Sequence, residues 1–564
     1  MDIRSSLKDS IAKSLGRLGI SVEADKIPLE HPAELKNGDY SSGVALQFAK
    51  QAGTAPRALA EKIVAALGTI DGIAKIEVAG AGFINFYLTP SALAEAVETA
   101  RREDMWGSGS LNAGKKIMVE YTDPNPFKEF HIGHLMSNAI GESIARLMQF
   151  SGANVKRANY QGDVGPHVAK AIWGLQKFGL NVGDKKAWPL GRAYSQGAEA
   201  YESDAAAKEQ IDKINTQVYD RSDPVINNIY DQGREASLAH FESIYKILGT
   251  KFDFYFFESE TAARGVELVK KHPEVFEASD GAIVYKGEQD GLHTRVFITS
   301  KGLPTYETKE LGLAELKAEK CMADVSITIT AHEQSDYFKV VLAAMRKVLP
   351  EIAAKIEHVS HGMLRFAEGK MSSRTGNVIT GESLLADLTE AAKVRAAESR
   401  ADNADILAQQ IAVAAIKYQI LKQASGKDII FDRERALSLE GDSGPYLQYA
   451  HARAHQLVEK AGSEGVALRF PKGDASGIPE SANELARLLH RFPEAVEYAA
   501  AHSEPHLLTN YLLEFAAAFN SWYAQVHVLD GTPEQAHKVA LVDAVRHTLK
   551  NGLWILGIPA PERM

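Results

Sequence analysis

The segment from Ile117 to Leu147 constrains the fold more than any other part of the chain. Apolar residues run from 117 to 121, prolines interrupt the chain at 124 and 126, and apolar residues at helical spacing follow His131. The segment therefore predicts a strand, a loop and a helix in succession. The first turn of such a helix offers free backbone N–H groups and the positive end of the helix dipole, which together favour a phosphate group.

Two histidines stand at the start of this predicted helix. His131 and His134 are three residues apart, so both can donate hydrogen bonds to phosphate oxygens, and Gly133 allows a flat group to approach closely. Surface histidines, or two ligands of a metal ion, are the alternatives. A zinc site needs further ligands, and the single cysteine, Cys321, has no Glu or His ladder nearby, so the sequence predicts no metal site.

A second stretch, G-K-M-S-S-R-T-G-N at 369–377, gathers two cations and two hydroxyls in one glycine-bounded loop. These groups suit charge that moves along a polyphosphate; taken alone, the stretch also fits a basic surface turn. Together with H-I-G-H at 131–134, it resembles the paired signatures of class I aminoacyl-tRNA synthetases. The pattern V-E-Y-x-x-P-N at 119–125 is similar to that of arginyl-tRNA synthetases in particular.

The resemblance implies an arginine–tRNA ligase. Such an enzyme activates L-arginine with ATP to arginyl-adenylate and transfers arginine to the 3′-terminal adenosine of tRNA-Arg for translation, releasing pyrophosphate and AMP. The family implies Mg²⁺ carried by ATP, and no zinc. Position by position, the implied ATP-binding residues are His131, Gly133, His134, Lys370, Met371, Ser372 and Ser373, and the implied catalytic residues are His131, His134, Lys370, Arg374 and Lys128. Ser373 stands where a second lysine is common, and Lys128 is expected to supply that cation.

A guanidinium group needs carboxylates that accept its fork of N–H donors, because burying it without them is costly. Glu120 ends the first predicted strand and faces the ligand crevice by position. The segment T-Y-E-T-K-E at 305–310 resembles the family's Y-x-T-R-D, with Glu310 where Asp is usual and Lys309 where Arg is usual. The implied arginine-binding residues are Glu120, Asn125, Tyr306, Glu310 and Gln334; for each, the alternative is an ordinary helix-surface or cap residue.

The length of 564 residues allows roughly three domains, and the 45% of apolar residues can fill several cores. Strand, helix and strand within 117–160 predict a βαβ unit. The predicted fold class is α/β, with a Rossmann-type parallel-sheet catalytic core, an N-terminal α+β domain and a C-terminal all-α helical bundle. The predicted domains are 1–107, 108–390 and 391–564. A helical insertion at about 178–245 is expected between the two halves of the sheet, and the strand signal disappears beyond about 390.

The N-terminal domain carries one expected tRNA contact. G-D-Y at 38–40 and G-F-I-N-F at 82–86 resemble the family's domain that holds the tRNA elbow near the D-loop. The resemblance implies that Phe83 stacks on a base and that Asn85 hydrogen-bonds its edge, a combination suited to an unpaired nucleotide. The alternative is that Phe83 belongs to the core and that Asn85 satisfies the turn.

The C-terminal domain carries the other expected tRNA contact. Residues 441–453 and 556–564 resemble signatures of the family's anticodon-binding domain. The base-contacting residues implied there are Tyr446, Tyr449 and Arg453, which share a helix face, and Tyr523. A helical aromatic stripe is also typical of a hydrophobic core, and this alternative stays open.

Composition limits the class of protein. A formal charge of −10 argues against a globally basic nucleic-acid binder, although phosphate contacts need only a local basic face. No window approaches the ~20 apolar residues of a membrane span, and the N-terminus has no apolar signal core. A single cysteine excludes an intrachain disulfide. We therefore expect a cytoplasmic protein, a monomer without membrane contact, whose partners are tRNA-Arg, ATP and L-arginine.

Other classes fit less well. A small-molecule nucleotidylyltransferase also uses H-x-G-H at a helix start, but needs neither a long helical C-terminal domain nor Glu120 and Glu310 together. A catalytically inactive RNA-binding paralogue is expected to have lost His131, His134 or Lys370. Among class I synthetases, the cysteine enzyme needs zinc-ligating cysteines, and the branched-aliphatic enzymes need an editing insertion that this length cannot hold.

Overall fold

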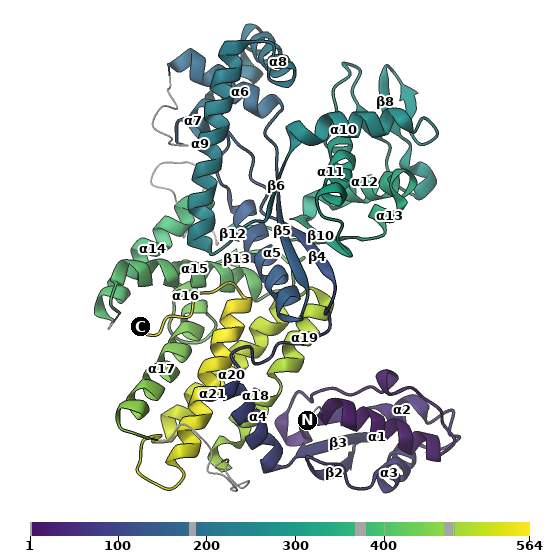
Figure 1. Cartoon of the computed structure of the whole chain (residues 1–564), viewed down its shortest axis with the longest axis vertical. Coiled ribbons are helices and arrows are strands. Elements are labelled where there is room, and N and C mark those ends of the chain that lie inside the picture. Colours follow the sequence, from purple (N-terminus) through teal and green to yellow (C-terminus); the bar gives the residue numbers. More distant parts are fainter. Residues whose placement is uncertain (1–2, 180–187, 367–379, 400, 467–477, 479) are drawn as a thin grey trace.

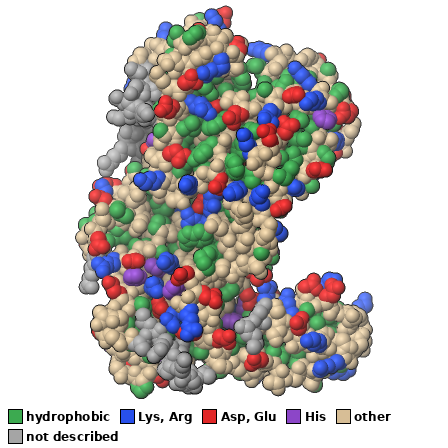
Figure 2. All heavy atoms as spheres, in the orientation of Figure 1, with side chains coloured by type: hydrophobic (Ala, Val, Ile, Leu, Met, Phe, Trp, Pro, Cys, Tyr) green, Lys and Arg blue, Asp and Glu red, His purple; other side chains and the backbone are tan. Residues whose placement is uncertain are grey.

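The computed structural model describes residues 3–179, 188–366, 380–399, 401–466, 478 and 480–564. Figure 1 shows an elongated molecule with a sheet at its centre. Two units of the catalytic part lie on one side of the sheet, a helical domain lies on the other, and the N-terminal domain projects sideways from the helical domain. Figure 2 shows a deep recess between that N-terminal domain and the catalytic part.

The central sheet has five parallel strands in the order β11-β10-β4-β5-β6. Its strands are β4 (Lys116–Glu120), β5 (Asn154–Gln161), β6 (Phe254–Phe257), β10 (Val325–Ala331) and β11 (Ile356–His361). β4 lies in the middle, and its apolar residues 117–119 are buried, as expected of a parallel strand covered on both faces. The sheet confirms the predicted α/β fold class, and its carboxyl ends form the edge at which ligands bind in such folds.

Helix α5 (Ile132–Phe150) follows β4 and is buried almost all round. It contacts the sheet strands on one side and helices of the C-terminal domain on the other. Small residues on α5 allow the close approach; a Cβ at Gly141 would lie 2.3 Å from the side chain of Tyr121. The helix therefore joins the predicted phosphate site to the C-terminal domain.

A second unit flanks the sheet; it is formed by the chain between β6 and β10 together with the two helices between β10 and β11. It contains a three-stranded antiparallel sheet in the order β7-β8-β9 and packs its own hydrophobic core around Phe276, Tyr285 and Phe297. Its elements are α10 (Glu258–Lys271), β7 (Glu277–Ser279), β8 (Ala282–Tyr285), β9 (Arg295–Ile298), α11 (Tyr306–Lys320), α12 (Ser335–Val348) and α13 (Pro350–Ala353).

The helical insertion is present, but its predicted place in the sheet is wrong. Its helices are α6 (Pro166–Phe178), α7 (Trp188–Ser203), α8 (Ala205–Asp220) and α9 (Pro224–Leu248). They lie between β5 and β6, which are neighbours on the same side of β4, so the insertion interrupts one half of the sheet. The unit of β7 to β9 separates the two halves instead. Strand order depends on long-range pairing, which the local pattern of residues 178–245 does not contain.

The N-terminal domain is a small α+β unit. A three-stranded sheet, β1-β3-β2, is covered by helices whose apolar residues, such as Leu7, Ile11 and Ile63, are fully buried. Its elements are α1 (Ile3–Arg17), β1 (Tyr40–Ser42), α2 (Val44–Phe48), α3 (Pro56–Leu67), β2 (Ile73–Ala79) and β3 (Phe83–Leu88), followed by α4 (Pro90–Arg102). α4 packs against α18 and α21 of the C-terminal domain.

The C-terminal part is helical apart from one short strand. β13 (Ile429–Phe431) pairs with β12 (Leu364–Phe366), so the expectation that strands end near 390 is wrong. Two consecutive helices, α18 (Asn483–His490) and α19 (Phe492–His502), are separated by Arg491, because Pro493 starts a new helix. The other helices are α14 (Gly381–Glu398), α15 (Ala404–Leu421), α16 (Arg433–Ala436), α17 (Gly444–Ser463), α20 (Pro505–Gln525) and α21 (Gln535–Ile555).

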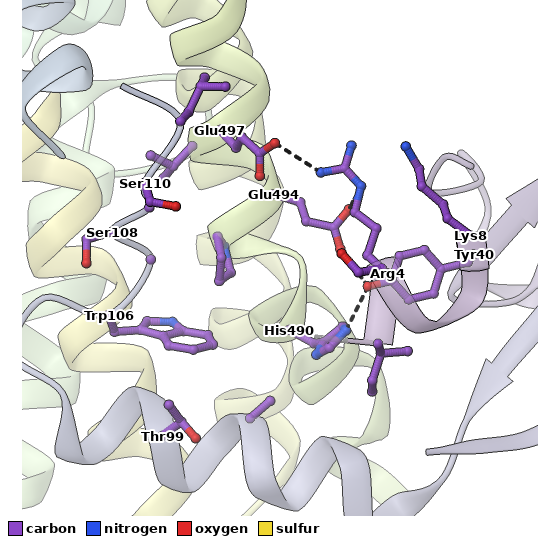
Figure 3. A pocket seen from close by; sticks show the side chains of 18 of the residues that line it. Arg4, Lys8, Tyr40, Thr99, Trp106, Ser108, Ser110, His490, Glu494 and Glu497 are labelled. Atoms are coloured by element: carbon purple, nitrogen blue, oxygen red, sulfur yellow. Dashed lines mark hydrogen bonds and ion pairs between the residues drawn. The ribbon is translucent and has the colours of Figure 1, made fainter. Parts of the chain in front are cut away.

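The N-terminal domain meets α18 and α19 through polar contacts. The Tyr40 hydroxyl donates to Glu494 at 2.5 Å and lies 3.1 Å from Nε2 of His490, and Arg4 pairs with Glu497 at 3.3 Å. Figure 3 shows these side chains around a cavity of about 670 Å³, with Trp106 on the opposite wall. The contact of the N-terminal domain with α18 and α19 is therefore polar and partly hollow, whereas α4 adds apolar packing against α18 and α21.

A buried lysine ties the catalytic part to the C-terminal domain. Lys417 of α15 is fully buried, and its Nζ donates to the carbonyl oxygens of Leu248 at 2.7 Å and Gly557 at 2.9 Å. Arg146 of α5 donates to the neighbouring carbonyls of Gly249 and Trp554. Both cations thus meet the C-terminal ends of α9 and α21, where the helix dipoles are negative. Burial, together with Arg146, lowers the pKa of Lys417 to about 7.

The crossing of α6 and α7 gives a prediction about stability. A Cβ at Gly197 would lie 2.0 Å from the carbonyl oxygen of Lys170, so we expect Gly197→Ala to force the helices apart and to cost about 1–3 kcal/mol. Thermal unfolding of the full chain measures the loss. Gly16→Ala, in helix α1 with open space around the added methyl, is the matched control. An equal midpoint for both variants would contradict the tight crossing.

Candidate functional site

The loop between β4 and α5 holds an unusual backbone conformation. Thr122, Asp123 and Phe127 have φ values of 81°, 48° and 68°, which L-residues rarely adopt. Hydrogen bonds from neighbouring elements fix the loop: the Thr122 N–H donates to Ser137 Oγ at 2.9 Å, and the Phe127 N–H donates to Ser237 Oγ at 2.9 Å. The loop is therefore held in one shape before any ligand binds.

The two histidines lie together at the end of this loop. The backbone N–H of His131, the N-cap of α5, donates to Nδ1 of His134 at 3.2 Å, and the two rings stack with centroids 3.5 Å apart. Because Nδ1 of His134 accepts this bond, the proton of the neutral ring lies on Nε2. Nε2 is then a hydrogen-bond donor available to a ligand at the helix N-terminus.

Desolvation keeps both histidines neutral. Partial burial lowers the pKa of His131, with Lys128 adding to the effect, and full burial lowers the pKa of His134 well below the usual value. Burial also lowers the pKa of Lys128, together with the nearby Lys170. The Nζ of Lys128 lies 5.2 Å from the ring centroid of Tyr194. The histidines thus act as neutral donors, and Lys128 is the cation beside them.

The second motif adjoins the first. Residues 367–379, which include Lys370, Met371, Ser372, Ser373 and Arg374, lie outside the described residues. The next residue, Thr380, forms a β-bridge with His131, and the N–H of Gly381 donates to the carbonyl oxygen of Phe130 at 2.9 Å. The chain thus leaves the second motif directly beside the histidines.

Four carboxyl groups gather at the carboxyl ends of β4 and β6. They are Glu120 at the end of β4, Asp123 in the following loop, Glu258 at the start of α10, and Glu310 on α11. Only Glu120 and Glu310 were predicted as site residues. Asp123 lies within the V-E-Y-x-x-P-N pattern, which gave a local signal, whereas Glu258 is recognisable only as a polar residue that follows a predicted strand.

Two buried lysines of α11 pair with two of these carboxylates. Lys309 Nζ lies 2.6 Å from Glu258 Oε2, and Lys317 Nζ lies 3.0 Å from Glu120 Oε2. The second pair has the distance of an ion pair without hydrogen-bond geometry, and the buried Oε2 of Glu120 has no hydrogen-bond partner among the described residues. One acceptor atom of the cluster is thus unfilled. Lys317 was not predicted; its place seven residues after Glu310 on one helix face is the signal that was available.

Burial and a neighbouring carboxylate raise the pKa values of the other two carboxyl groups, Glu310 and Asp123. Burial and the charge of Glu120 raise the pKa of Glu310 to about 8, and the same two causes raise the pKa of Asp123 well above its usual range. The Asp123 carboxylate accepts the Tyr160 N–H at 2.7 Å. The cluster therefore favours the protonated form of Glu310 at neutral pH, a state that an added cation would reverse.

The remaining predicted arginine-binding residues surround this cluster. The Oδ1 of Asn125 accepts the N–H of Gly162 at 3.0 Å, so this side chain is held against β5. Tyr306 is 62% exposed, and its ring centroid lies 5.2 Å from Lys309 Nζ. Gln334 is exposed at the start of α12, just beyond the end of β10. Tyr306 and Gln334 thus have surface that a ligand can contact.

In the N-terminal domain, the structure separates the two predicted base contacts. Phe83 is 39% exposed at the start of β3. Asn85, two residues along the same strand, is buried, and its Oδ1 accepts the Ser41 hydroxyl at 2.8 Å. The prediction that Asn85 reads a base edge is not supported by this placement, because its side chain joins β1 to β3 inside the sheet. Phe83 stays a predicted contact.

In the C-terminal domain, Arg453 lies between two tyrosine rings. Its guanidinium is 4.6 Å from the ring centroid of Tyr449 on α17 and 5.0 Å from that of Tyr523 on α20. It donates to the Tyr449 hydroxyl at 3.0 Å and to Asn520 at 2.6 Å. Tyr446 is half-buried and packs against the main hydrophobic core. Arg453, Tyr449 and Tyr523 thus form a stacked group of partly exposed side chains.

None of the described helices is long and apolar enough to cross a membrane. In the described part of the chain, no group of three or more His, Cys, Asp and Glu side chains is arranged to hold a metal ion.

Three family models match successive parts of the chain. They are the N-terminal domain of arginyl tRNA synthetase at residues 3–88, the catalytic domain of class I tRNA synthetases (R) at 98–433, and the DALR anticodon binding domain at 447–564. Two similar proteins are named arginine–tRNA ligase. That of Treponema pallidum subsp. pallidum is 30% identical over 96% of each chain. That of Limosilactobacillus reuteri is 29% identical over 100% of each chain.

Solved structures agree with these matches. The arginyl-tRNA synthetase of Thermus thermophilus superposes with a TM-score of 0.82 at 27% identity, and the match covers 99% of both chains. That of Plasmodium falciparum superposes with a TM-score of 0.77 at 21% identity, covering 99% of this chain and 98% of that one. The second likeness supports the fold alone.

The buried pair between α10 and α11 gives a prediction about the site. Lys309→Met leaves the Glu258 carboxylate buried without its partner, so we expect a loss of about 3–5 kcal/mol of stability. Thermal unfolding measures the effect. Lys339→Met, which breaks an exposed pair with Asp336, is the control and is expected to change stability by under about 1 kcal/mol. Equal small effects for both variants would show that the buried pair is not formed in solution.

Proposed function

Since the chain belongs to the class I arginyl-tRNA synthetases, we propose that the crevice at the carboxyl ends of β4 and β5 is its site of arginine activation. The chain is an arginine–tRNA ligase, which uses ATP to activate arginine and transfers it to tRNA. One observation carries the assignment of the site: four carboxyl groups and two lysines share the crevice, and Glu120 has a buried acceptor atom without a hydrogen-bond donor among the described residues. A guanidinium supplies the missing hydrogen-bond donors.

In the proposed arginine pocket, Glu120 and Glu310 accept the guanidinium, and Tyr306 stacks on it. Asn125 and Gln334 bind the amino-acid end of the substrate. Asn125 Oδ1 is occupied by the N–H of Gly162, so its amide NH₂ is the group that faces the substrate and would donate to the carboxylate. The exposed ring of Tyr306 offers a flat face to a planar cation.

The proposed chemistry needs no covalent enzyme intermediate. The carboxylate of arginine attacks the α-phosphorus of ATP in line, and pyrophosphate leaves. His131 and His134 donate hydrogen bonds to phosphate oxygens from the N-terminus of α5, where the helix dipole adds to the attraction. Lys128, Lys370 and Arg374 neutralise the charge on the departing pyrophosphate, and Gly133, Met371, Ser372 and Ser373 complete the proposed ATP site. Mg²⁺ would arrive with ATP.

The transfer step brings tRNA to the same crevice. We propose that Tyr449, Arg453 and Tyr523, with Tyr446 beside them, contact the anticodon, and that Phe83 contacts the elbow. The recess of Figure 2 lies between the N-terminal domain and the catalytic part. Because the net charge of the chain is −10, RNA phosphates would be bound by local basic groups and not by the overall charge. A monomeric state belongs to the same proposal, because each proposed site is built from one chain. The domain limits near 107 and 390 and a cytoplasmic location are also part of the proposal.

Charging of tRNA with each amino acid in turn tests the proposed function. We expect the protein to charge total tRNA with arginine alone. Lys370→Ala and Glu120→Gln should each lower kcat/KM by about 10²-fold or more, because each removes a charge that faces the reacting substrates. Lys339→Ala, a surface lysine, is the control. If no amino acid is charged while ATP–pyrophosphate exchange persists without tRNA, a nucleotidylyltransferase is the better account.

The stacked group of the C-terminal domain gives a separate prediction. Arg453→Ala and Tyr523→Ala should raise the KM for tRNA by roughly 5- to 100-fold, since a base stack is worth about 1–3 kcal/mol. The KM values for arginine and ATP should stay unchanged. Tyr498→Ala, an exposed aromatic residue on α19, is the matched control. Steady-state aminoacylation measures all three constants, and an unchanged KM for tRNA would place the anticodon elsewhere.

A further inference from the structure

Lys317 lies within the proposed arginine pocket. It follows Glu310 by seven residues on α11, so both side chains leave the same face of the helix. Lys317 and Glu120 are 9% and 3% exposed, and Lys317 and Glu310 line one cavity of about 40 Å³. A space of this size holds about one water molecule. The ammonium group of Lys317 thus stands where a substrate guanidinium would meet Glu120.

The charged and titratable groups around Glu310 come from every neighbouring element. They are Glu120 of β4, Asp123 of the following loop, Tyr160 of β5, Glu258 of α10, Lys309 and Lys317 of α11, Tyr337 of α12, and Cys321 and Lys355 on the wall of the cavity. Lys309 is paired with Glu258. Lys317 is therefore the lysine that faces Glu120, Asp123 and Glu310 together, and it lowers the pKa of the last two against burial and repulsion.

In the free pocket, little negative charge remains to pair with a substrate cation. Glu120 is neutralised by Lys317, and Glu310, whose pKa is about 8, carries a proton at pH 7. A guanidinium cannot lose its proton in a protein, so a buried guanidinium needs a further negative charge. That charge arises when the Glu310 carboxyl group ionises.

We propose that Lys317 is a positioning residue that acts as a resident counter-ion of Glu120 and thereby makes Glu310 give up one proton to solvent when arginine binds. This inference rests on the proposed function. The balance is simple: the O–H bond of the Glu310 carboxyl group breaks, its proton goes to water or buffer, and the guanidinium keeps all of its own protons. Glu120 then shares two cations, and Glu310 pairs with the guanidinium.

The pH dependence of the arginine KM tests the proposal. With ATP and tRNA saturating, the KM of the full chain should fall by about tenfold per pH unit between roughly pH 6 and 7.5 and level off above pH 8, because one proton leaves on binding. In Lys317→Met, the guanidinium takes the place of the ammonium group beside Glu120, so Glu310 keeps its proton. The KM should then change by less than about twofold over the same range.

Other variants separate charge from packing. Lys317→Arg keeps the cation and should keep the wild-type slope, even where kcat falls. Glu310→Gln removes the proton donor and should flatten the profile while raising the KM, whereas Asp123→Asn should leave the slope unchanged. Lys320→Met, at the exposed end of the same helix, is the control. A flat profile for Asp123→Asn together with a normal one for Glu310→Gln would overturn the assignment of the proton to Glu310.

Calorimetry gives a readout that a structural role would not move. Titration of the full chain with arginine at pH 7, in two buffers of different ionisation enthalpy, should count about one proton released by the wild type and close to none by Lys317→Met. Equal proton counts for the two proteins would overturn the proposal. A wild-type protein that charges no arginine would instead refute the proposed function, so the two failures are distinguishable.

Discussion

The active part of this protein depends on a loop that is held in an unfavourable backbone conformation. Three L-residues between β4 and α5 have positive φ angles, each of which costs on the order of 1–2 kcal/mol. Hydrogen bonds from α5, α9 and β5 hold the loop in this shape. As a result, Glu120 at the end of β4 and Asp123 in the following loop lie near α11. The same loop ends at the N-cap of α5 and places His131 there. The anion site and the cation site are thus two sides of one constrained turn.

The sites on this turn have opposite electrostatic character. At the N-terminus of α5, neutral histidines and a helix dipole form the proposed phosphate site, with Lys128 beside them. A short distance away, carboxyl groups outnumber lysines in a buried cluster. Arginine and ATP carry opposite charges, and a single crevice that bound both through side-chain charges alone would neutralise itself. In the proposed site, a helix N-terminus and neutral histidines share the phosphate contacts with Lys128, whereas the guanidinium site is built from carboxylates, and this keeps the two binding sites compatible.

The sequence predicted the elements whose signal is local. Residues 117–121 are mostly apolar and short, and the periodic spacing after His131 extends over a whole helix, so the βαβ unit and its helix N-terminus followed directly. The position of the insertion, the strand at 429–431 and the partner of Glu120 depend on contacts between distant segments, which no local pattern records. Asn85 shows the same limit: residues 84–86 are all buried, so strand alternation did not reveal which side chain is internal. Lys317 was overlooked because a lysine on a helix is usually solvated.

The clamp formed by Lys417 and Arg146 has a consequence for how the chain can be divided. Domain limits drawn along the sequence suggest modules that could be cut apart and studied alone. At this junction, however, the ammonium of α15 finds its acceptors only at the last turns of a catalytic-part helix and of the terminal helix. A fragment that ended before Gly557, or that began after Leu248, would deprive this buried amine of one of its two acceptors. Lys417 and Arg146 thus tie the catalytic and helical parts to each other, so a cut between these two parts would break a buried contact as well as the chain.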